Sequence, residues 1–237
     1  MVQTAESIGN IDWRKIRIED CGEALVGLDD SGILEDAIYA GLGLSNENKV
    51  RLRSGIVEKL KEAQSILSKK MPGYRLKVWD GFRTLETQDL LFYNYLSDLY
   101  REHNNWSDDE LKAAVNIFVS FPSEDVTAPS WHNTGGAIDL SIVGPDGHYL
   151  DMGTSFDEFN ERAFTDYFAN PEEASKKSGF PIERCLAIQK NRQLLKEIME
   201  EFDFVNFENE WWHFSHGDQL WAAQSGSDKA IYGSMEL

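Results

Sequence analysis

The chain has 237 residues, of which 41% are hydrophobic and 12% are aromatic, so it can bury one substantial core. Its 41 acidic residues outnumber its 23 lysines and arginines, which gives a formal net charge of −18 at pH 7. This balance disfavours nucleic acid or an anionic membrane surface as the main partner, because both attract positively charged surfaces.

The N-terminal segment, residues 1–20, has no apolar run of the signal-peptide type and is expected to be a tether. No later segment reaches the length of an apolar membrane span. Cys21 and Cys185 are the only cysteines, and we expect so widely separated a pair to stay as free thiols in a reducing compartment. Together these features predict a cytoplasmic protein with no membrane partner.

Residues 21–48 contain five glycines, and their pattern assigns no element. Between residues 49 and 69, apolar side chains recur at steps of three and four, which predicts an amphipathic helix. Residues 71–73, Met-Pro-Gly, are expected to end that helix. Apolar and basic side chains then alternate over residues 74–79, which predicts a short strand.

Two capping signals predict the next helices. Thr84 is expected to cap a helix that runs to about His103, with Glu86 favourable in its first turn. Ser107 and Glu110 form a capping box at the start of another helix.

The C-terminal half mixes strands with one long helix. Residues 137–143 predict a short apolar strand, and residues 144–150 predict the turn and return of a hairpin. Residues 182–202 predict an amphipathic helix, and residues 204–214 predict a final strand. This mixture predicts one α+β domain over residues 1–237, with a small, mainly antiparallel sheet flanked by helices.

A histidine and an aspartate, His132 and Asp139, stand seven residues apart with two glycines between them. The glycines argue against a helix, so we expect a turn leading into a strand, where both side chains can converge. His213 is the natural third ligand, because two imidazoles and one carboxylate leave a coordination position open. Zinc suits this set and brings the pKa of a bound water to near ~7.

Two further residues are candidates for catalysis. Glu210 precedes His213 by three residues, so its carboxylate can stand beside a metal, take a proton from water and pass it to a leaving amine. Arg83 stands at the end of a strand and turn, where a fixed guanidinium could hold the oxyanion of a tetrahedral intermediate. Together with the metal ligands, they predict metal-assisted hydrolysis of an amide.

The motifs Ser130-x-His132-x-x-Gly135-x-Ala137-x-Asp139 and Glu210-x-x-His213 resemble those of zinc peptidases that act on D-alanyl-D-alanine. Within the D,D-peptidase and hedgehog superfamily, the chain resembles the D-alanyl-D-alanine dipeptidases of the vancomycin-resistance type. That branch is also matched by Asp80-Gly-Phe-Arg83, by Met152-Gly153-Thr154-x-Phe156-Asp157 and by Glu210-Trp-Trp-His213. The resemblance covers roughly residues 74–216 and implies the α+β fold of that superfamily.

The resemblance implies a role for each matched residue. His132, Asp139 and His213 bind one zinc ion per chain, Glu210 is the general base and acid, Arg83 stabilises the transition state, Asp157 holds the substrate's free α-ammonium, and Ser130 helps to place the dipeptide. The substrate implied is D-alanyl-D-alanine or a related free dipeptide.

The chain departs from the family pattern at two places. The family has an Asn-Phe-Thr-Gly-like stretch near the N-terminus, and residues 21–48 contain none. Thr84 follows Arg83, where the family often has proline. Neither departure touches the predicted metal ligands or the base, but both leave open which side chains the pocket accepts.

Three other functions remain open at this point. A D,D-carboxypeptidase or endopeptidase acting on peptidoglycan stem peptides would use the same chemistry, although the strong negative charge argues against contact with the cell wall. A non-catalytic, zinc-stabilised binding module would need neither Glu210 nor Arg83. An iron(II) oxygenase could use two histidines and a carboxylate, but the helical content of the chain disagrees with the barrel usual for that class.

Overall fold

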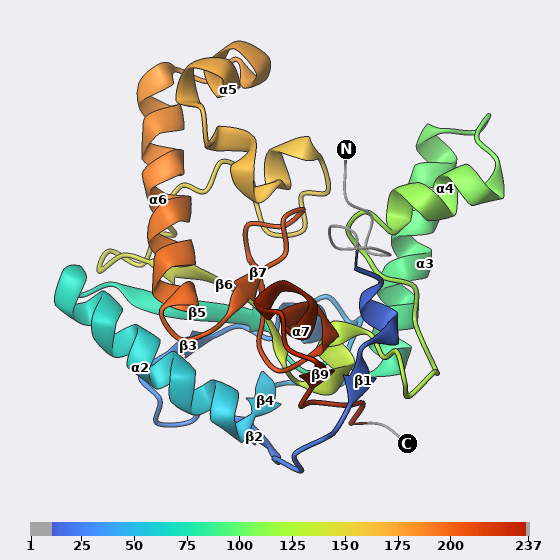
Figure 1. Ribbon diagram of the computed structural model, residues 1–237. Coiled ribbons are helices and arrows are strands. Elements are labelled where there is room, and N and C mark those ends of the chain that lie inside the picture. Colours follow the sequence, from blue (N-terminus) through green and yellow to red (C-terminus); the bar gives the residue numbers. More distant parts are fainter. Residues whose placement is uncertain (1–10, 236–237) are drawn as a thin grey trace.

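A five-stranded sheet organises the computed structural model, which describes residues 11–235 (Figure 1). Its strands follow the order β3-β5-β6-β8-β7, and only the pair of β3 with β5 is parallel. The strands of this sheet are β3 (Leu34–Glu35), β5 (Arg75–Asp80), β6 (Ala137–Val143), β7 (Val205–Asn206) and β8 (His213–Ser215). The prediction of a mainly antiparallel sheet in an α+β fold is confirmed.

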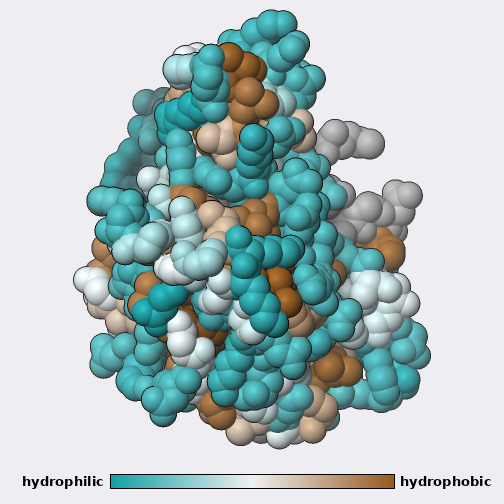
Figure 2. Space-filling view, turned by 90° about the vertical axis from the view of Figure 1, so that its left-hand side faces the viewer, coloured by the Kyte–Doolittle hydropathy of each residue, from teal (hydrophilic) through white to brown (hydrophobic). Residues whose placement is uncertain are grey.

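Helices surround this sheet on several sides. They are α1 (Ile38–Gly41), α2 (Ser54–Lys70), α3 (Leu85–Glu102), α4 (Asp108–Val115), α5 (Pro171–Ser178), α6 (Ile182–Glu200) and α7 (Gln219–Ser225). Figure 1 shows α5 and α6 on one side of the molecule and α3 and α4 on the other, with α2 along the lower edge. Helix α2 packs on both β5 and α6. Figure 2 shows the side of the molecule on which α2, α5 and α6 lie. This face is mostly hydrophilic, with smaller groups of apolar residues between the hydrophilic ones.

The main core lies between the central strands and the helices α2 and α6. Leu60, Leu140 and Leu195 belong to it and are fully buried. All seven residues of β6 are buried, including the polar Asp139 and Ser141. Because a buried polar group is costly unless it is paired, polar residues in the most buried strand indicate a functional site there.

The structure agrees with several predicted elements. Strand β6 has the predicted bounds, residues 137–143. The side chain of Thr84 accepts a hydrogen bond from the main-chain nitrogen of Thr87, and Ser107 and Glu110 form the expected capping box. An apolar run and capping residues, which act within a few positions along the chain, were therefore sufficient to predict these elements.

Other predicted bounds were wrong where pairing between distant segments decides the structure. The helix predicted over residues 49–69 begins only at Ser54, because strand β4 (Arg51–Arg53) pairs with β2 (Leu25–Gly27). The single strand predicted over residues 204–214 is two short antiparallel strands, β7 and β8, joined by a turn. The helix predicted over residues 182–202 ends at Glu200.

The N-terminal tether prediction is wrong for residues 13–18, and residues 1–10 lie outside the described chain. Trp13 is buried, and its ring packs on Trp131, with 5.2 Å between the ring centroids. Strand β1 (Arg17–Ile18) pairs in parallel with β9 (Lys229–Ala230). This segment is therefore part of the fold.

Both cysteines are free thiols, as predicted, with Cys21 exposed and Cys185 buried. In the part of the chain that the structure describes, no helix combines the length and the apolar character needed to cross a membrane.

The glycine pair before β6 lets the chain turn sharply into the strand. Gly135 adopts a left-handed conformation with φ of 71°, which disfavours side chains. At Gly136 the φ is ordinary, but a Cβ atom would lie 2.6 Å from the main-chain oxygen of His216. No side chain fits there unless the backbone moves.

Replacing Gly136 with alanine should destabilise the protein by about 1–3 kcal/mol, because the added methyl group overpacks against backbone. Gly41→Ala is the matched control, since a Cβ at Gly41 meets no atom within 4 Å. The control should leave the free energy of unfolding unchanged or raise it by up to about 1 kcal/mol. Urea unfolding of both variants measures this, and equal stabilities would contradict the close-approach explanation.

Candidate active site

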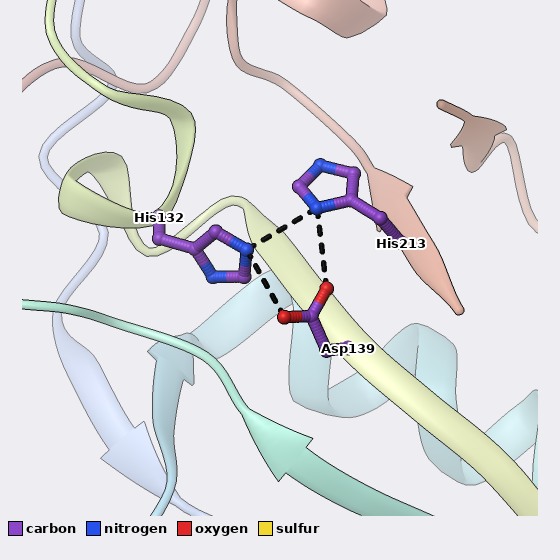
Figure 3. Close-up of side chains that lie close together, drawn as sticks. All are labelled: His132, Asp139 and His213. Carbon is purple, nitrogen blue, oxygen red and sulfur yellow. Dashed lines mark hydrogen bonds and ion pairs between the residues drawn. The ribbon is translucent and has the colours of Figure 1, made fainter. Parts of the chain in front are cut away.

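Three buried side chains from separate parts of the chain converge at the sheet (Figure 3). Nε2 of His132 lies 3.2 Å from Nδ1 of His213 and 3.4 Å from Oδ2 of Asp139. Nδ1 of His213 lies 3.2 Å from Oδ1 of Asp139. The three predicted metal ligands are therefore brought together.

The register of the sheet explains this convergence. Asp139 on the central strand β6 is paired with His213 on β8 and, on its other side, with Asp80 at the end of β5. Residues directly opposite one another in antiparallel strands present their side chains on the same face. His132 belongs to the 3-10 helix η2 (Trp131–Thr134), which ends at the glycine pair immediately before β6.

Hydrogen bonds to the far side of each ring orient the histidines. Nδ1 of His132 lies 2.8 Å from the carbonyl oxygen of Gly81, which can only accept, so this nitrogen carries the proton of the neutral ring. The lone pair of Nε2 then faces Asp139. Nε2 of His213 lies 3.3 Å from Oγ of Ser215, which leaves Nδ1 facing the same point. Such outer partners are how proteins fix metal-binding histidines.

Burial and charge oppose each other in this cluster. Burial would raise the pKa of Asp139, but His132 and His213 together hold that pKa well below its usual range. Burial would lower the pKa of His132, but Asp139 raises it. Burial prevails at His213 and lowers its pKa. The carboxylate thus keeps its negative charge and favours a cation at this point.

The observed distances fit a zinc ion. A tetrahedral site with bonds of roughly 2.0–2.2 Å separates neighbouring ligand atoms by about 3.3 Å. The three separations in the cluster are 3.2, 3.4 and 3.2 Å. Two imidazole nitrogens and one carboxylate are also a donor set that zinc accepts with a position left open.

Glu210 lies in the turn between β7 and β8. Its main-chain nitrogen donates to the carbonyl oxygen of Phe207 at 3.0 Å, and Asn206 donates to the carbonyl oxygen of Glu210 at 3.0 Å. This turn brings Oε2 of Glu210 to 3.7 Å from Nδ1 of His213. Burial, reinforced by nearby carboxylates such as Asp139, raises the pKa of Glu210 well above its usual value. A carboxyl group with a raised pKa beside the predicted metal ligands is suited to accept a proton and to return it.

Arg83 follows β5, and its guanidinium is held from several sides. Nε donates to Oδ2 of Asp80 at 2.9 Å, and Nη1 donates to Oε1 of Gln88 at 2.9 Å. Nη2 lies 3.4 Å from the hydroxyl of Tyr39 and 3.7 Å from Oδ2 of Asp139. Burial would lower the pKa of Arg83, but Asp80 and the other acidic neighbours raise it, so the side chain stays charged. The guanidinium therefore forms an ion pair with Asp80 and also faces Asp139, one of the three predicted metal ligands.

Asp157 comes from an irregular segment after the hairpin and caps no helix. Its Oδ2 accepts a hydrogen bond from the hydroxyl of Tyr39 at 2.8 Å. Its φ is 57°, a left-handed conformation unusual outside glycine. Burial, and then the charge of Asp139, raises the pKa of Asp157 to about 7. A carboxylate placed in this way is stabilised by a cationic ligand.

These groups line one small cavity of about 50 Å³. The lining also includes apolar side chains, among them Leu91, Phe118, Val119, Phe159 and Phe207.

Ser130 is not part of the cavity lining. It stands directly before η2, and its hydroxyl is buried without a hydrogen-bond partner in the described chain. The structure thus brings together the predicted ligands, Glu210, Arg83 and Asp157 in one cavity, and Ser130 is not among the residues that line it.

Tyr39 is a site residue that the sequence did not reveal. It is buried and contacts both Asp157 and Arg83. It lies in the segment over residues 21–48, where no pattern assigned an element. Asp80 is the other addition, because its Oδ2 lies 3.2 Å from Nδ1 of His132 and also binds Arg83. The Asp-Gly-Phe-Arg motif was the signal that could have identified Asp80.

Known proteins with similar sequences include two D-alanyl-D-alanine dipeptidases. The chain is similar to the D-alanyl-D-alanine dipeptidase of Synechocystis sp., with 29% identity over 220 residues that cover 88% of each protein. It is also similar to the D-alanyl-D-alanine dipeptidase of Escherichia coli, with 30% identity over 152 residues, or 64% of this chain and 60% of that protein.

Two solved structures are similar at lower identity. The LdcB LD-carboxypeptidase gives a TM-score of 0.46 at 16% identity, covering 90% of this chain and 76% of that one. The vancomycin-resistance D,D-pentapeptidase VanY in complex with Zn(II) gives 0.44 at 18% identity, covering 78% and 83%. A family model described as D-ala-D-ala dipeptidase matches residues 35–230. The resemblance predicted from the motifs is confirmed, and the chain belongs to the D-ala-D-ala dipeptidase family of M15 peptidases.

Proposed function

We propose that this protein is a zinc-dependent dipeptidase that hydrolyses D-alanyl-D-alanine or a related free dipeptide. The observation that carries the proposal is that the metal cluster, Glu210, Arg83 and Asp157 all line one cavity. The names of the curated relatives support the substrate class.

His132, Asp139 and His213 would hold one zinc ion per chain, as their separations allow. When bound, zinc would polarise the scissile carbonyl and make a nucleophilic water available at neutral pH. Glu210 would accept a proton from the attacking water at its carboxylate and deliver that proton to the leaving amine. Its raised pKa supports the second step, because the protonated form must persist long enough to act as an acid.

Arg83 would donate hydrogen bonds to the oxygen on which negative charge develops. Asp80 and Gln88 already fix its guanidinium, so little reorganisation is needed during the reaction. Asp157 would pair with the substrate's α-ammonium. A blocked amino terminus would leave this buried carboxylate without a cation, which is costly and so selects for free dipeptides.

The remaining assignments stay predictions. The role of Ser130 in placing the dipeptide is one of them, since its hydroxyl is buried without a hydrogen-bond partner in the described chain and lies outside the cavity lining. A single domain, a cytoplasmic location and a small dipeptide substrate, without a nucleic-acid or membrane partner, are likewise predictions from the sequence.

A substrate panel tests the proposal. With zinc bound, the purified protein should release D-alanine from D-alanyl-D-alanine about a hundredfold or more faster, in kcat/KM, than from the N-acetylated dipeptide, because blocking removes the cation that pairs with Asp157. A pentapeptide ending in D-alanyl-D-alanine is the third substrate. Faster cleavage of the blocked dipeptide or the pentapeptide would favour the carboxypeptidase or endopeptidase alternative. No turnover with zinc bound would favour a binding module.

Replacing Glu210 with glutamine should lower kcat by about 10²–10⁴-fold, because the amide cannot transfer the proton. Zinc content, measured by metal analysis, should remain near that of the wild type. Glu208→Gln is the matched control, since Glu208 is exposed in the same turn. Near-normal turnover in the Glu210 variant would remove its assigned role.

Zinc should raise the free energy of unfolding by about 4 kcal/mol when free zinc exceeds its Kd a thousandfold. The increase should shrink as the pH falls, because the raised pKa of His132 means that this ligand must release a proton before it binds metal. Asp139→Asn should abolish the increase, and Asp146→Asn, at an exposed hairpin position, should retain it. Thermal unfolding with and without zinc measures the effect, and a zinc-induced shift that survives in Asp139→Asn would contradict the ligand assignment.

A further inference from the structure

Arg192 on α6 is a buried arginine whose hydrogen bonds all end on main-chain oxygens. Its Nε donates to the carbonyl oxygen of Met152 at 2.8 Å, and Nη1 donates to that of Phe164 at 2.7 Å. Nη2 donates to the carbonyl oxygen of Arg162 at 2.7 Å. Only 5% of Arg192 is exposed. The guanidinium therefore lies inside the fold and clamps a single stretch of backbone.

The charge of Arg192 has no direct carboxylate contact among residues 11–235. Asp151 and Asp166 act on it only through space, and burial lowers its pKa to about 9. A buried cation without an ion-pair partner is costly unless other groups satisfy it, and here charge-assisted bonds to carbonyl oxygens do so. The planar fork of arginine can reach three such oxygens at once, which lysine cannot.

The clamped stretch, residues 152–165, carries the proposed ammonium-binding residue. Arg192 binds the stretch near both of its ends, and Asp157 lies between them. The 3-10 helix η3 (Glu161–Ala163) is the only regular element that lies wholly inside the stretch, and a second 3-10 helix, η4 (Thr165–Phe168), begins at its last residue. Asp157 keeps a left-handed backbone, and such conformations persist only where the surrounding structure holds them.

The same stretch is tied to the turn that carries Glu210. The main-chain nitrogen of Trp211 donates to the carbonyl oxygen of Ala163 at 3.0 Å, and its indole nitrogen donates to Oγ1 of Thr154 at 2.7 Å. The segment that carries Asp157 and the turn that carries Glu210 are therefore hydrogen-bonded to each other. Arg192 binds the first of these two segments.

We propose that Arg192 is a positioning residue that fixes Asp157 for the substrate's α-ammonium, and thereby selects dipeptides with a free amino terminus. The proposal rests on the proposed dipeptidase function. Arg192 is absent from the cavity lining, so it acts through the backbone of residues 152–165 and not by contact with the substrate.

The experiment compares Arg192→Lys and Arg192→Gln with the wild type on D-alanyl-D-alanine and on its N-acetylated form. We expect KM for the free dipeptide to rise about tenfold to a hundredfold, because a small misplacement of a binding group has effects of this size. The value of kcat and the zinc content should change little, and kcat/KM for the blocked dipeptide should be unchanged. Arg184→Lys is the matched control, since Arg184 is an exposed arginine on the same helix whose guanidinium pairs with the side chain of Asp151 and lies over the ring of Phe180.

A double-mutant cycle with Asp157→Asn distinguishes positioning from general weakening. If Arg192 acts through Asp157, the double variant should be hardly worse than Asp157→Asn alone, whereas independent effects would add. Additive losses, equal losses on both substrates, or an unchanged KM would overturn the proposal.

Thermal unfolding identifies variants that do not fold. In that case Thr154→Val provides the second test, because it removes one of the two hydrogen bonds between the same stretch and Trp211 without removing the buried cation. It should raise KM selectively for the free dipeptide, and an unchanged selectivity would overturn the proposal. Failure of the dipeptidase assignment itself would look different, since the wild type would then not prefer the free dipeptide at all.

Discussion

The structure depends on one constraint, the register that aligns Asp80, Asp139 and His213 across three neighbouring strands. A carboxylate at the centre of a buried strand is tolerable only if cations and hydrogen-bond donors surround it. The guanidinium of Arg83 lies 3.7 Å from Oδ2 of Asp139, whereas Oδ1 has no hydrogen-bond partner in the described chain, so a bound cation would complete that requirement. The glycine turn before β6 then determines where His132 can lie, and the turn between β7 and β8 does the same for Glu210.

Much of the site could be predicted because its signals are local. The metal ligands stand in two short motifs, and each motif sits on a turn beside a strand of the sheet, so the spacing of a few residues nearly fixes the geometry. Strand β6 and the caps of α3 and α4 were predicted for the same reason, since apolar runs and capping boxes act within a few residues.

The rest depends on contacts between distant residues. Tyr39 belongs to the site because its hydroxyl reaches Asp157, 118 residues further along the chain, and nothing near Tyr39 indicates that contact. Arg51–Arg53 forms a strand only because Leu25–Gly27 lies beside it. Trp13 stands in a largely polar terminal segment of the sequence, but its ring packs on Trp131, more than a hundred residues away. No local pattern encodes such partners.

The crowding of acidic groups near the cavity couples metal binding to proton release. Burial and mutual repulsion raise the pKa values of Asp80, Asp157 and Glu210, so these groups take up protons more readily than exposed carboxyl groups do. A cation held by His132, Asp139 and His213 would oppose this effect, because a nearby positive charge favours the ionised carboxylate. Metal binding would therefore release protons from the neighbouring carboxyl groups as well as fill the metal site.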